Sequence, residues 1–421
     1  MRTLCVFWDE VLVGHLAETG MRAMSFRYAA TYLSSARPRP ISLSLPLQPE
    51  AFDGDVARSW FANLLPEGDI RGHVARRLGV SERNDFALLN GIGGDCAGAL
   101  RILPEHAAGA QAGKLIPLPW DELEETIAAT PRPSLLALVM QDRELRLSLA
   151  GAQDKLPVHF ADGRLSLPSG NRASTHLLKI ASGGFPDLVQ NELFCLTLAR
   201  GVGLDVPPAQ MAATATPILI VERYDRRTDA DGTVRRLHQE DFCQALGLPP
   251  DMKYENEGGP SLAAMFEVLA RGSRSPLPDK RELLKWVLFN YVIGNADAHA
   301  KNVSLLHGDL DDDRGPHLAP FYDLVCTEVY GGLARRQAQK IGGEYRTGSI
   351  GGRHWDRFSA AIDINPKYLR TVAAEMCARV EAAAVPLARS LGAGGSGTAT
   401  LERIAGVVGG RLGKLRADLA G

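Results

Sequence analysis

The sequence predicts an α+β protein in which a β-rich N-terminal part is followed by an all-helical C-terminal part. Short segments with alternating apolar residues, which are typical of strands, recur through residues 1–240. Long segments with helical periodicity, such as 368–391 and 400–419, dominate residues 241–421. In addition, the strongly apolar segment 283–293 runs directly into a polar stretch, which indicates a buried helix with a polar loop at its end.

Length and composition limit the class of protein. The chain has 421 residues, enough for two or three domains, and its net charge of -2 gives no indication of direct nucleic-acid binding. Its 6 cysteines are scattered without the close pairing of a zinc site, so we expect buried free thiols. The N-terminus does not resemble a signal peptide, and no apolar run is long enough to span a bilayer. We therefore expect a cytoplasmic protein that does not enter a membrane.

Residues 1–110 are expected to form a first domain. Alternation predicts strands, helical spacing predicts two helices, and Gly79 is expected to end the second helix. The glycine-rich loop 91–95 is interpreted as a turn, because no phosphate-binding pattern follows it. A linker is expected at 106–117. The predicted strands are 4–8, 11–16, 24–28, 41–47 and 98–103, and the predicted helices are 56–64 and 70–78.

Residues 118–240 are expected to form a second, strand-rich domain. The alternating Leu145, Leu147 and Leu149 predict a strand with Ser148 near its end, and small residues at 150–155 follow before further strands. A loop with little side-chain bulk lets backbone N–H groups approach phosphates closely, although a simple tight turn would have the same composition.

Lys179 is the next residue of interest, because it lies between apolar neighbours in a predicted strand, where an ammonium group needs a partner. Glu192 lies on the apolar face of the helix that starts at 186–187. A strand lysine paired with a helix glutamate is the arrangement with which kinases hold the phosphates of a nucleotide. An ordinary half-buried ion pair remains the alternative. The apolar strand 218–224 would then lead to the base of the nucleotide.

Residues 241–421 contain the candidate catalytic and metal-binding residues. Asp297 and Asn302 have the spacing of the catalytic aspartate and the metal-binding asparagine of protein kinases, and Asp323 follows where a kinase has its second metal-binding carboxylate. This arrangement predicts a two-lobed, protein-kinase-like fold. The alternative is a helix C-cap at Asn295 and an Asx-turn at Asp297.

At this point the sequence resembles the HipA-type serine/threonine-protein kinase toxins of toxin–antitoxin pairs. The resemblance covers nearly the whole chain, including the first domain, and its matching motifs occur in the same order as in the family. The motifs lie at residues 63–68, 94–100, 148–155, 176–179, 221–226, 239–247, 253–255, 297–302 and 321–323.

The resemblance implies the role of each site residue. It implies a catalytic base at Asp297, Mg²⁺ ligands at Asn302 and Asp323, and autophosphorylation at Ser148. It also implies that His299 lies beside the nucleotide. The remaining residues implied to bind ATP are Ala150, Gly151, Ala152, Gln153, Asp154 (where glutamate is frequent in the family), Lys155, Lys179, Glu222 and Tyr224.

The resemblance also implies partners. These are a HipB-like helix-turn-helix antitoxin, operator DNA reached only through that antitoxin, and a protein substrate, in particular an aminoacyl-tRNA synthetase such as the glutamyl enzyme, whose phosphorylation causes growth arrest and persistence. Two other functions stay open. A small-molecule phosphotransferase has a similar catalytic loop, but nothing that corresponds to the first domain. A catalytically dead corepressor would not need Lys179, Asp297, Asn302 and Asp323.

Overall fold

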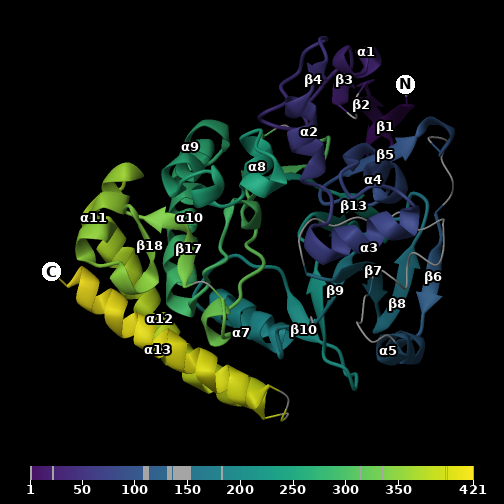
Figure 1. Ribbon diagram of the computed structural model, residues 1–421. Helices are drawn as coiled ribbons and strands as arrows, with labels where there is room; N and C mark the ends of the chain where they lie inside the picture. Colours follow the sequence, from purple (N-terminus) through teal and green to yellow (C-terminus); the bar gives the residue numbers. More distant parts are fainter. Residues whose placement is uncertain are drawn as a thin grey trace. The chain divides into compact units, whose positions relative to one another are not determined.

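The fold is described from a computed structural model (Figure 1), and it divides into two compact units. Unit 1 comprises residues 1–182, 212–250 and 305–316, and unit 2 comprises residues 183–211, 251–304 and 317–421. The domain boundaries expected from the sequence stay a prediction. The described residues are 2–20, 23–107, 113–129, 135, 153–181, 184–312, 314–333, 335–393, 395 and 397–420.

The first sheet of unit 1 is built from the N-terminal strands in the order β4-β3-β2-β1-β5. The strands predicted at 4–8 and 11–16 are confirmed as the antiparallel pair β1 and β2, and both predicted helices are confirmed. Gly79 ends the second helix with a φ of 66°. Buried side chains such as Trp8, Phe26 and Trp60 fill the core between this sheet and its helices. The elements are β1 (Arg2–Trp8), β2 (Val11–Glu18), β3 (Met24–Tyr28), α1 (Ala30–Leu33), β4 (Phe52–Asp53), α2 (Asp55–Ala62), α3 (Gly68–Leu78), α4 (Asp85–Ile92) and β5 (Leu100–Pro104).

The strand predicted at 41–47 is wrong. That segment forms turns with one isolated bridge, between Ser42 and Leu45. Its backbone groups bond to side chains instead of to a neighbouring strand, because the Tyr28 hydroxyl donates to the Leu45 carbonyl (2.6 Å) and the Leu43 N–H donates to Glu240 (3.0 Å). Alternating apolar residues predict which side chains are buried, but the backbone hydrogen bonds decide whether a strand forms.

In the second sheet, the five strands that belong to unit 1 lie in the order β11-β9-β7-β8-β6. One face packs on a core that includes Leu156, Leu178 and Ile220. Because side chains alternate along a strand, the residues between these positions point to the other face. The elements are β6 (Leu115–Leu118), α5 (Trp120–Ala129), β7 (Lys155–Ala161), β8 (Arg164–Pro168), β9 (His176–Ile180) and β11 (Ile218–Glu222), followed by β12 (Arg226–Thr228), β13 (Val234–Arg236), β14 (His238–Asp241), α8 (Phe242–Ala245) and β15 (Ser304–Gly308).

The predicted linker 106–117 is partly incorrect, since β6 belongs to this sheet. β6 pairs antiparallel with β8, with Leu118 opposite Leu165, and Leu118 is buried in the core. The apolar residues Leu115, Ile116 and Leu118 therefore outweigh the Ala, Gly and Pro content that favoured a linker.

Unit 2 is mainly helical. The long helices predicted at its C-terminal end are confirmed as α12 and α13, which lie side by side (Figure 1). The short hairpin of β17 and β18 was not anticipated in the C-terminal part, which was expected to be all-helical. The elements are α7 (Leu188–Gly201), β10 (Ala209–Met211), α9 (Leu262–Gly272), α10 (Pro276–Ile293), β16 (His317–Leu318), β17 (Arg336–Ile341), β18 (Glu344–Arg346), α11 (Gly352–Ala361), α12 (Pro366–Gly392) and α13 (Thr398–Leu419).

The prediction of buried free thiols is confirmed. All six cysteines are buried free thiols. Burial raises the pKa of Cys96 and Cys326 to about 12, so these thiols are protonated and unreactive near neutral pH.

Within the described ranges, no helix has both the length and the apolar character that crossing a membrane requires.

Candidate active site

The candidate catalytic loop begins where α10 ends. The buried helix predicted before the loop is confirmed, and Gly294 ends it in the left-handed conformation with a φ of 70°. A Cβ atom at Gly294 would approach Val407 Cγ1 to 2.9 Å and Glu328 Oε2 to 3.0 Å. Glycine at this position therefore allows both the sharp turn and the close approach of neighbouring elements.

Asn295 holds the loop together, and the sequence analysis treated it only as a possible helix cap. Its side-chain Oδ1 accepts from the Asp297 N–H (3.1 Å). Its Nδ2 donates to Asn290 Oδ1 (2.8 Å) and, more weakly, to the Asp323 carbonyl (3.5 Å). Since Asn295 is only 2% exposed, these bonds are shielded from water and link the Asp297 loop to the Asp323 loop.

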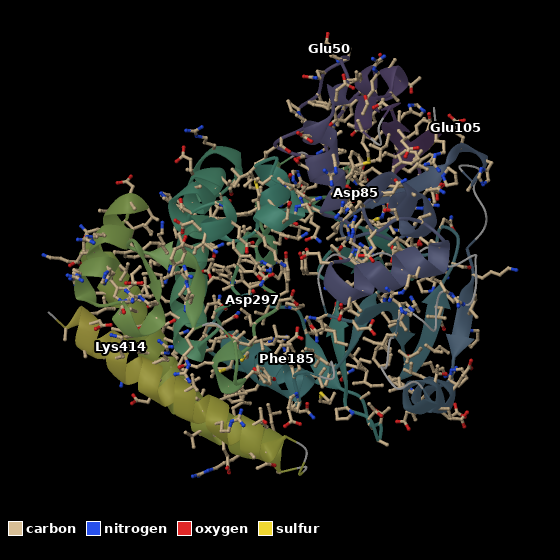
Figure 2. All side chains as sticks on the ribbon, viewed as in Figure 1. Glu50, Asp85, Glu105, Phe185, Asp297 and Lys414 are labelled. Carbon is tan, nitrogen blue, oxygen red and sulfur yellow. The ribbon has the colours of Figure 1, made fainter. Side chains whose placement is uncertain are left out.

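Asp297, which Figure 2 labels, is exposed, whereas the other polar residues of its loop are buried. The Asn302 Nδ2 donates to the Asp297 carbonyl (3.0 Å), as does the His299 N–H (2.9 Å). His299 and Asn302 are both buried. The structure therefore brings these three predicted residues together, with one carboxylate presented to solvent.

Asp323 follows a strongly anchored segment. The Phe321 ring stacks on Trp286 with ring centroids 6.1 Å apart, and the Phe321 N–H donates to the Asp205 carbonyl (2.8 Å). Asp323 itself has a φ of 52°, a conformation that most L-residues avoid. Asp9, Asp162, Asp187 and Asp363 share this conformation, so the backbone alone does not mark a functional site, and the role of Asp323 stays a prediction.

In unit 1, the candidate phosphate-binding lysines lie opposite each other. Lys155 on β7 and Lys179 on β9 are direct cross-strand partners, and Lys179 also pairs with Leu219 on β11. All lie on the face of the sheet that points away from the core. Lys179 is only 3% exposed. Because like charges directly opposite each other are unfavourable, this pair favours a nearby anionic group.

The other predicted nucleotide residues of unit 1 adjoin these lysines in sequence. The Asp154 carboxylate accepts from the Leu135 N–H (2.7 Å), and the buried Gln153 Nε2 has no acceptor within the part of the chain that the structure describes. Glu222 is exposed at the end of β11, and the half-buried Tyr224 donates its hydroxyl hydrogen bond to Gln239.

The structure does not test the position of some predicted site residues relative to the others. Ser148, Ala150, Gly151 and Ala152 lie outside the described residues. Glu192 is 1% exposed on α7 in unit 2, whereas Lys179 belongs to unit 1, so the predicted ion pair between them stays a prediction.

A buried charge network that the sequence analysis missed lies directly beside Glu222 and Tyr224. Arg223 bonds to Asp225 through two nitrogens (2.9 and 2.7 Å). Asp95 accepts from Arg226 (2.9 Å) and Arg236 (3.2 Å), and its other oxygen is 3.4 Å from Arg223. Burial alone would raise the pKa of Asp95, but the arginines outweigh it and hold that pKa well below its usual range. The network therefore ties the 94–98 turn to the segment after β11.

We expect the Asp95→Ala substitution to destabilise unit 1 by about 3–5 kcal/mol, because it leaves arginine side chains buried without their carboxylate. Urea unfolding at pH 7 measures the loss. Glu381→Ala is the control: it also removes a carboxylate bound to an arginine (Arg416, 2.7 Å), but this pair is exposed, so little change is expected. Equal stability of Asp95→Ala and the parent chain would contradict this role.

The same network predicts a pH dependence. The folded-state pKa of Asp95 is lowered, so its stabilisation is present above the ordinary value of 3.8 and is lost as the pH falls below it. The stability difference between the parent chain and Asp95→Ala should therefore shrink in acid.

The elements and the two units define the class of the fold, which is α+β, two-lobed and kinase-like. The candidate loop has the Asp297 and Asn302 spacing that is typical of kinases. Comparison with known families then identifies the family. The model of the HipA-like C-terminal domain matches residues 147–384, and that of the HipA N-terminal domain matches residues 4–103. The chain belongs to the HipA family of serine/threonine-protein kinase toxins.

Individual relatives agree with this assignment. A Sinorhizobium fredii protein named as a kinase, Y4mE, is 43% identical, and the match covers 88% of both chains. The serine/threonine-protein kinase toxin HipA of Shewanella oneidensis is 32% identical over 83% of this chain and 80% of its own length. A solved structure of the complex of Shewanella oneidensis HipA, HipB and operator DNA has a TM-score of 0.80 at 27% identity, covering 99% of this chain and 96% of that one.

Proposed function

We propose that this chain is an ATP-dependent serine/threonine-protein kinase that transfers the γ-phosphate of ATP to a protein hydroxyl, and that this activity makes it the toxin of a toxin–antitoxin pair. The observation that carries the proposal is the exposed Asp297 carboxylate in a loop whose other polar groups are buried. Asp297 accepts the proton of the attacking hydroxyl. The hydroxyl oxygen forms a bond to the γ-phosphorus, and the bond from that phosphorus to the β-phosphate oxygen breaks to release ADP.

Unit 1 supports nucleotide binding by its charges. Lys155 and Lys179 are cross-strand partners, and their ammonium groups suit the phosphates of ATP, while Gln153 can donate from its buried amide. The loop 150–155 is proposed to wrap the phosphates with its backbone N–H groups. Glu222 and Tyr224 are proposed to lie against adenine, in a segment fixed by the Arg223 network.

Mg²⁺ is the metal that kinases use, and the residues present fit it. Mg²⁺ prefers oxygen ligands and is usually held by one or two carboxylates together with substrate phosphates. Asp323 supplies a carboxylate, and Asn302 has its Nδ2 bonded to the Asp297 carbonyl, so its Oδ1 is the atom left to act as a ligand. The described residues contain no cluster of three or more His, Cys, Asp or Glu side chains arranged for a metal. When bound, Mg²⁺ would neutralise phosphate charge.

We further propose a HipB-like helix-turn-helix antitoxin as the partner. The support is the solved Shewanella oneidensis complex of HipA with HipB and its operator DNA. This chain has a net charge of -2, whereas duplex DNA binding depends on neutralising phosphates. Contact with operator DNA is therefore assigned to the antitoxin.

The proposed substrate is a cytoplasmic aminoacyl-tRNA synthetase, whose phosphorylation would arrest translation and growth. Phosphoproteomics after brief expression of the chain, with Asp297→Asn as the reference, tests both activity and substrate. New phosphoserine or phosphothreonine on a synthetase in the active form alone is the expected result. Identical phosphoproteomes in both forms would reject the kinase proposal, and a different phosphorylated protein would reject only the substrate.

Autophosphorylation of Ser148 is expected to switch the kinase off. A phosphate group adds about -1.5 to -2 charges at pH 7, which would repel the phosphates of ATP and compete for Lys179 or the loop N–H groups. ATP affinity should therefore be much weaker for fully phosphorylated protein than for unmodified protein, with the phosphate located by mass spectrometry. Equal ATP affinity and equal turnover of the two forms would refute the switch.

A further inference from the structure

The Tyr254 hydroxyl is bonded directly to the carboxylate on which the proposed chemistry depends. It donates to Asp297 Oδ1 at 2.6 Å, a short bond of the kind expected for a charged acceptor. The same ring meets the His299 ring edge-to-face, with centroids 5.3 Å apart and an interplanar angle of 82°. One side chain therefore contacts two residues of the catalytic loop.

The two carboxylate oxygens of Asp297 differ in their hydrogen bonding. Oδ1 is occupied by Tyr254, whereas Oδ2 has no hydrogen-bond donor in the part of the chain that the structure describes. A carboxylate held at one oxygen can still accept a hydroxyl proton at the other. Asp297 can therefore accept a hydrogen bond from Tyr254 at Oδ1 and from an acceptor hydroxyl at Oδ2 at the same time.

The segment that carries Tyr254 is anchored on both sides. The Lys253 carbonyl accepts from the Ala300 N–H of the catalytic loop (3.3 Å) and from the Gln339 Nε2 of β17 (3.3 Å). Glu255 accepts from the Lys340 N–H (2.7 Å), and its other oxygen is 3.6 Å from Lys340 Nζ. These bonds limit the positions that the Tyr254 hydroxyl can take.

We propose that Tyr254 is a positioning residue that fixes the Asp297 side chain and directs Oδ2 toward the acceptor hydroxyl. The inference rests on the proposed kinase function for its kinetic consequence. A misplacement of about 1 Å in a reacting group can cost about 10²-fold in rate. Tyr254→Phe keeps the ring beside His299 and removes only the hydroxyl, so kcat should fall by about 10–100-fold. KM for ATP should stay unchanged, because Tyr254→Phe keeps the ring that packs against His299.

The test combines a structure with kinetics. Crystal structures of the parent chain and Tyr254→Phe should show one Asp297 rotamer in the first and several in the second. Tyr368→Phe, at an exposed position of α12, is the matched control and should match the parent in both measurements. In an Asp297→Asn background, Tyr254→Phe should cause no further loss of kcat. If Tyr254→Phe instead damaged the structure in general, its loss of kcat would add to the loss caused by Asp297→Asn.

Each outcome decides the inference. An unchanged Asp297 rotamer in Tyr254→Phe overturns it, whatever the activity. A higher kcat in Tyr254→Phe also overturns it, because the phenol would then occupy the position of the acceptor hydroxyl and block it. If the parent chain proves to lack kinase activity, the proposed function fails, yet the rotamer comparison still decides whether Tyr254 positions Asp297.

Discussion

Asp297→Asn is expected to lower kcat for phosphotransfer by about 10²–10⁴-fold, the usual loss when a positioned general base is removed. Asparagine has the same shape as aspartate but cannot take the proton of the attacking hydroxyl. Its Oδ1 can still accept the hydrogen bond from Tyr254, so the loop should keep its conformation. Steady-state transfer from labelled ATP to a protein acceptor measures the effect.

Asp363→Asn is the matched control for this substitution. Asp363 is also an exposed aspartate of unit 2, and it lies after α11, away from the catalytic loop in sequence. It should retain full activity, and both variants should unfold at the temperature of the parent chain. Parent-like activity in purified Asp297→Asn would exclude Asp297 as the base.

Asp323→Ala has the second large expected effect. Its carboxylate is the proposed Mg²⁺ ligand, and a metal ion contributes several kcal/mol of charge stabilisation at a transferring phosphate, so activity should fall by about 10³-fold or more. The bond between Asn295 and the Asp323 backbone carbonyl does not need the carboxylate, so the link between the two loops should persist.

The control for Asp323→Ala must separate metal loss from backbone strain. Alanine at a φ of 52° costs about 1–2 kcal/mol. Asp363 has the same φ of 52°, so Asp363→Ala carries the same backbone cost without touching the site. If Asp363→Ala lost as much activity as Asp323→Ala, the loss would reflect strain, and the metal assignment would be wrong.

Sequence reasoning succeeded where the determining interactions are local. The apolar run before Gly294 and the glycine itself are enough to predict a buried helix with a sharp end, and α10 has both. The spacing of Asp297 and Asn302 is likewise local, and one hydrogen bond of 3.0 Å now joins them. Segment 41–47 shows the limit of this approach, because Glu240, which accepts its backbone bond, lies far along the chain.

Contacts between residues far apart in the sequence could not be predicted, and these contacts hold the candidate site residues in place. Arg223 and Asp95 are 128 positions apart, and Tyr254 and Asp297 are 43 apart. Each belongs to a motif that the sequence analysis had matched, but a single sequence does not tell which motifs touch. The Gly-rich 91–95 segment was interpreted as a turn, but residues 91–92 end α4 and the turn begins after them. The buried position of Asp95 within the arginine network explains why an acid is present there.

Transfer of the γ-phosphate to protein is the central claim, and one measurement tests it most directly. The purified chain, freed of antitoxin, is incubated with Mg²⁺, ATP labelled at its γ-phosphate and an extract of cytoplasmic proteins, with Asp297→Asn in parallel. Labelled phosphoserine or phosphothreonine on a defined protein, formed by the parent chain and reduced at least about 10²-fold in Asp297→Asn, is the predicted result. Label found only on small molecules, or equal labelling by both forms, would contradict the account.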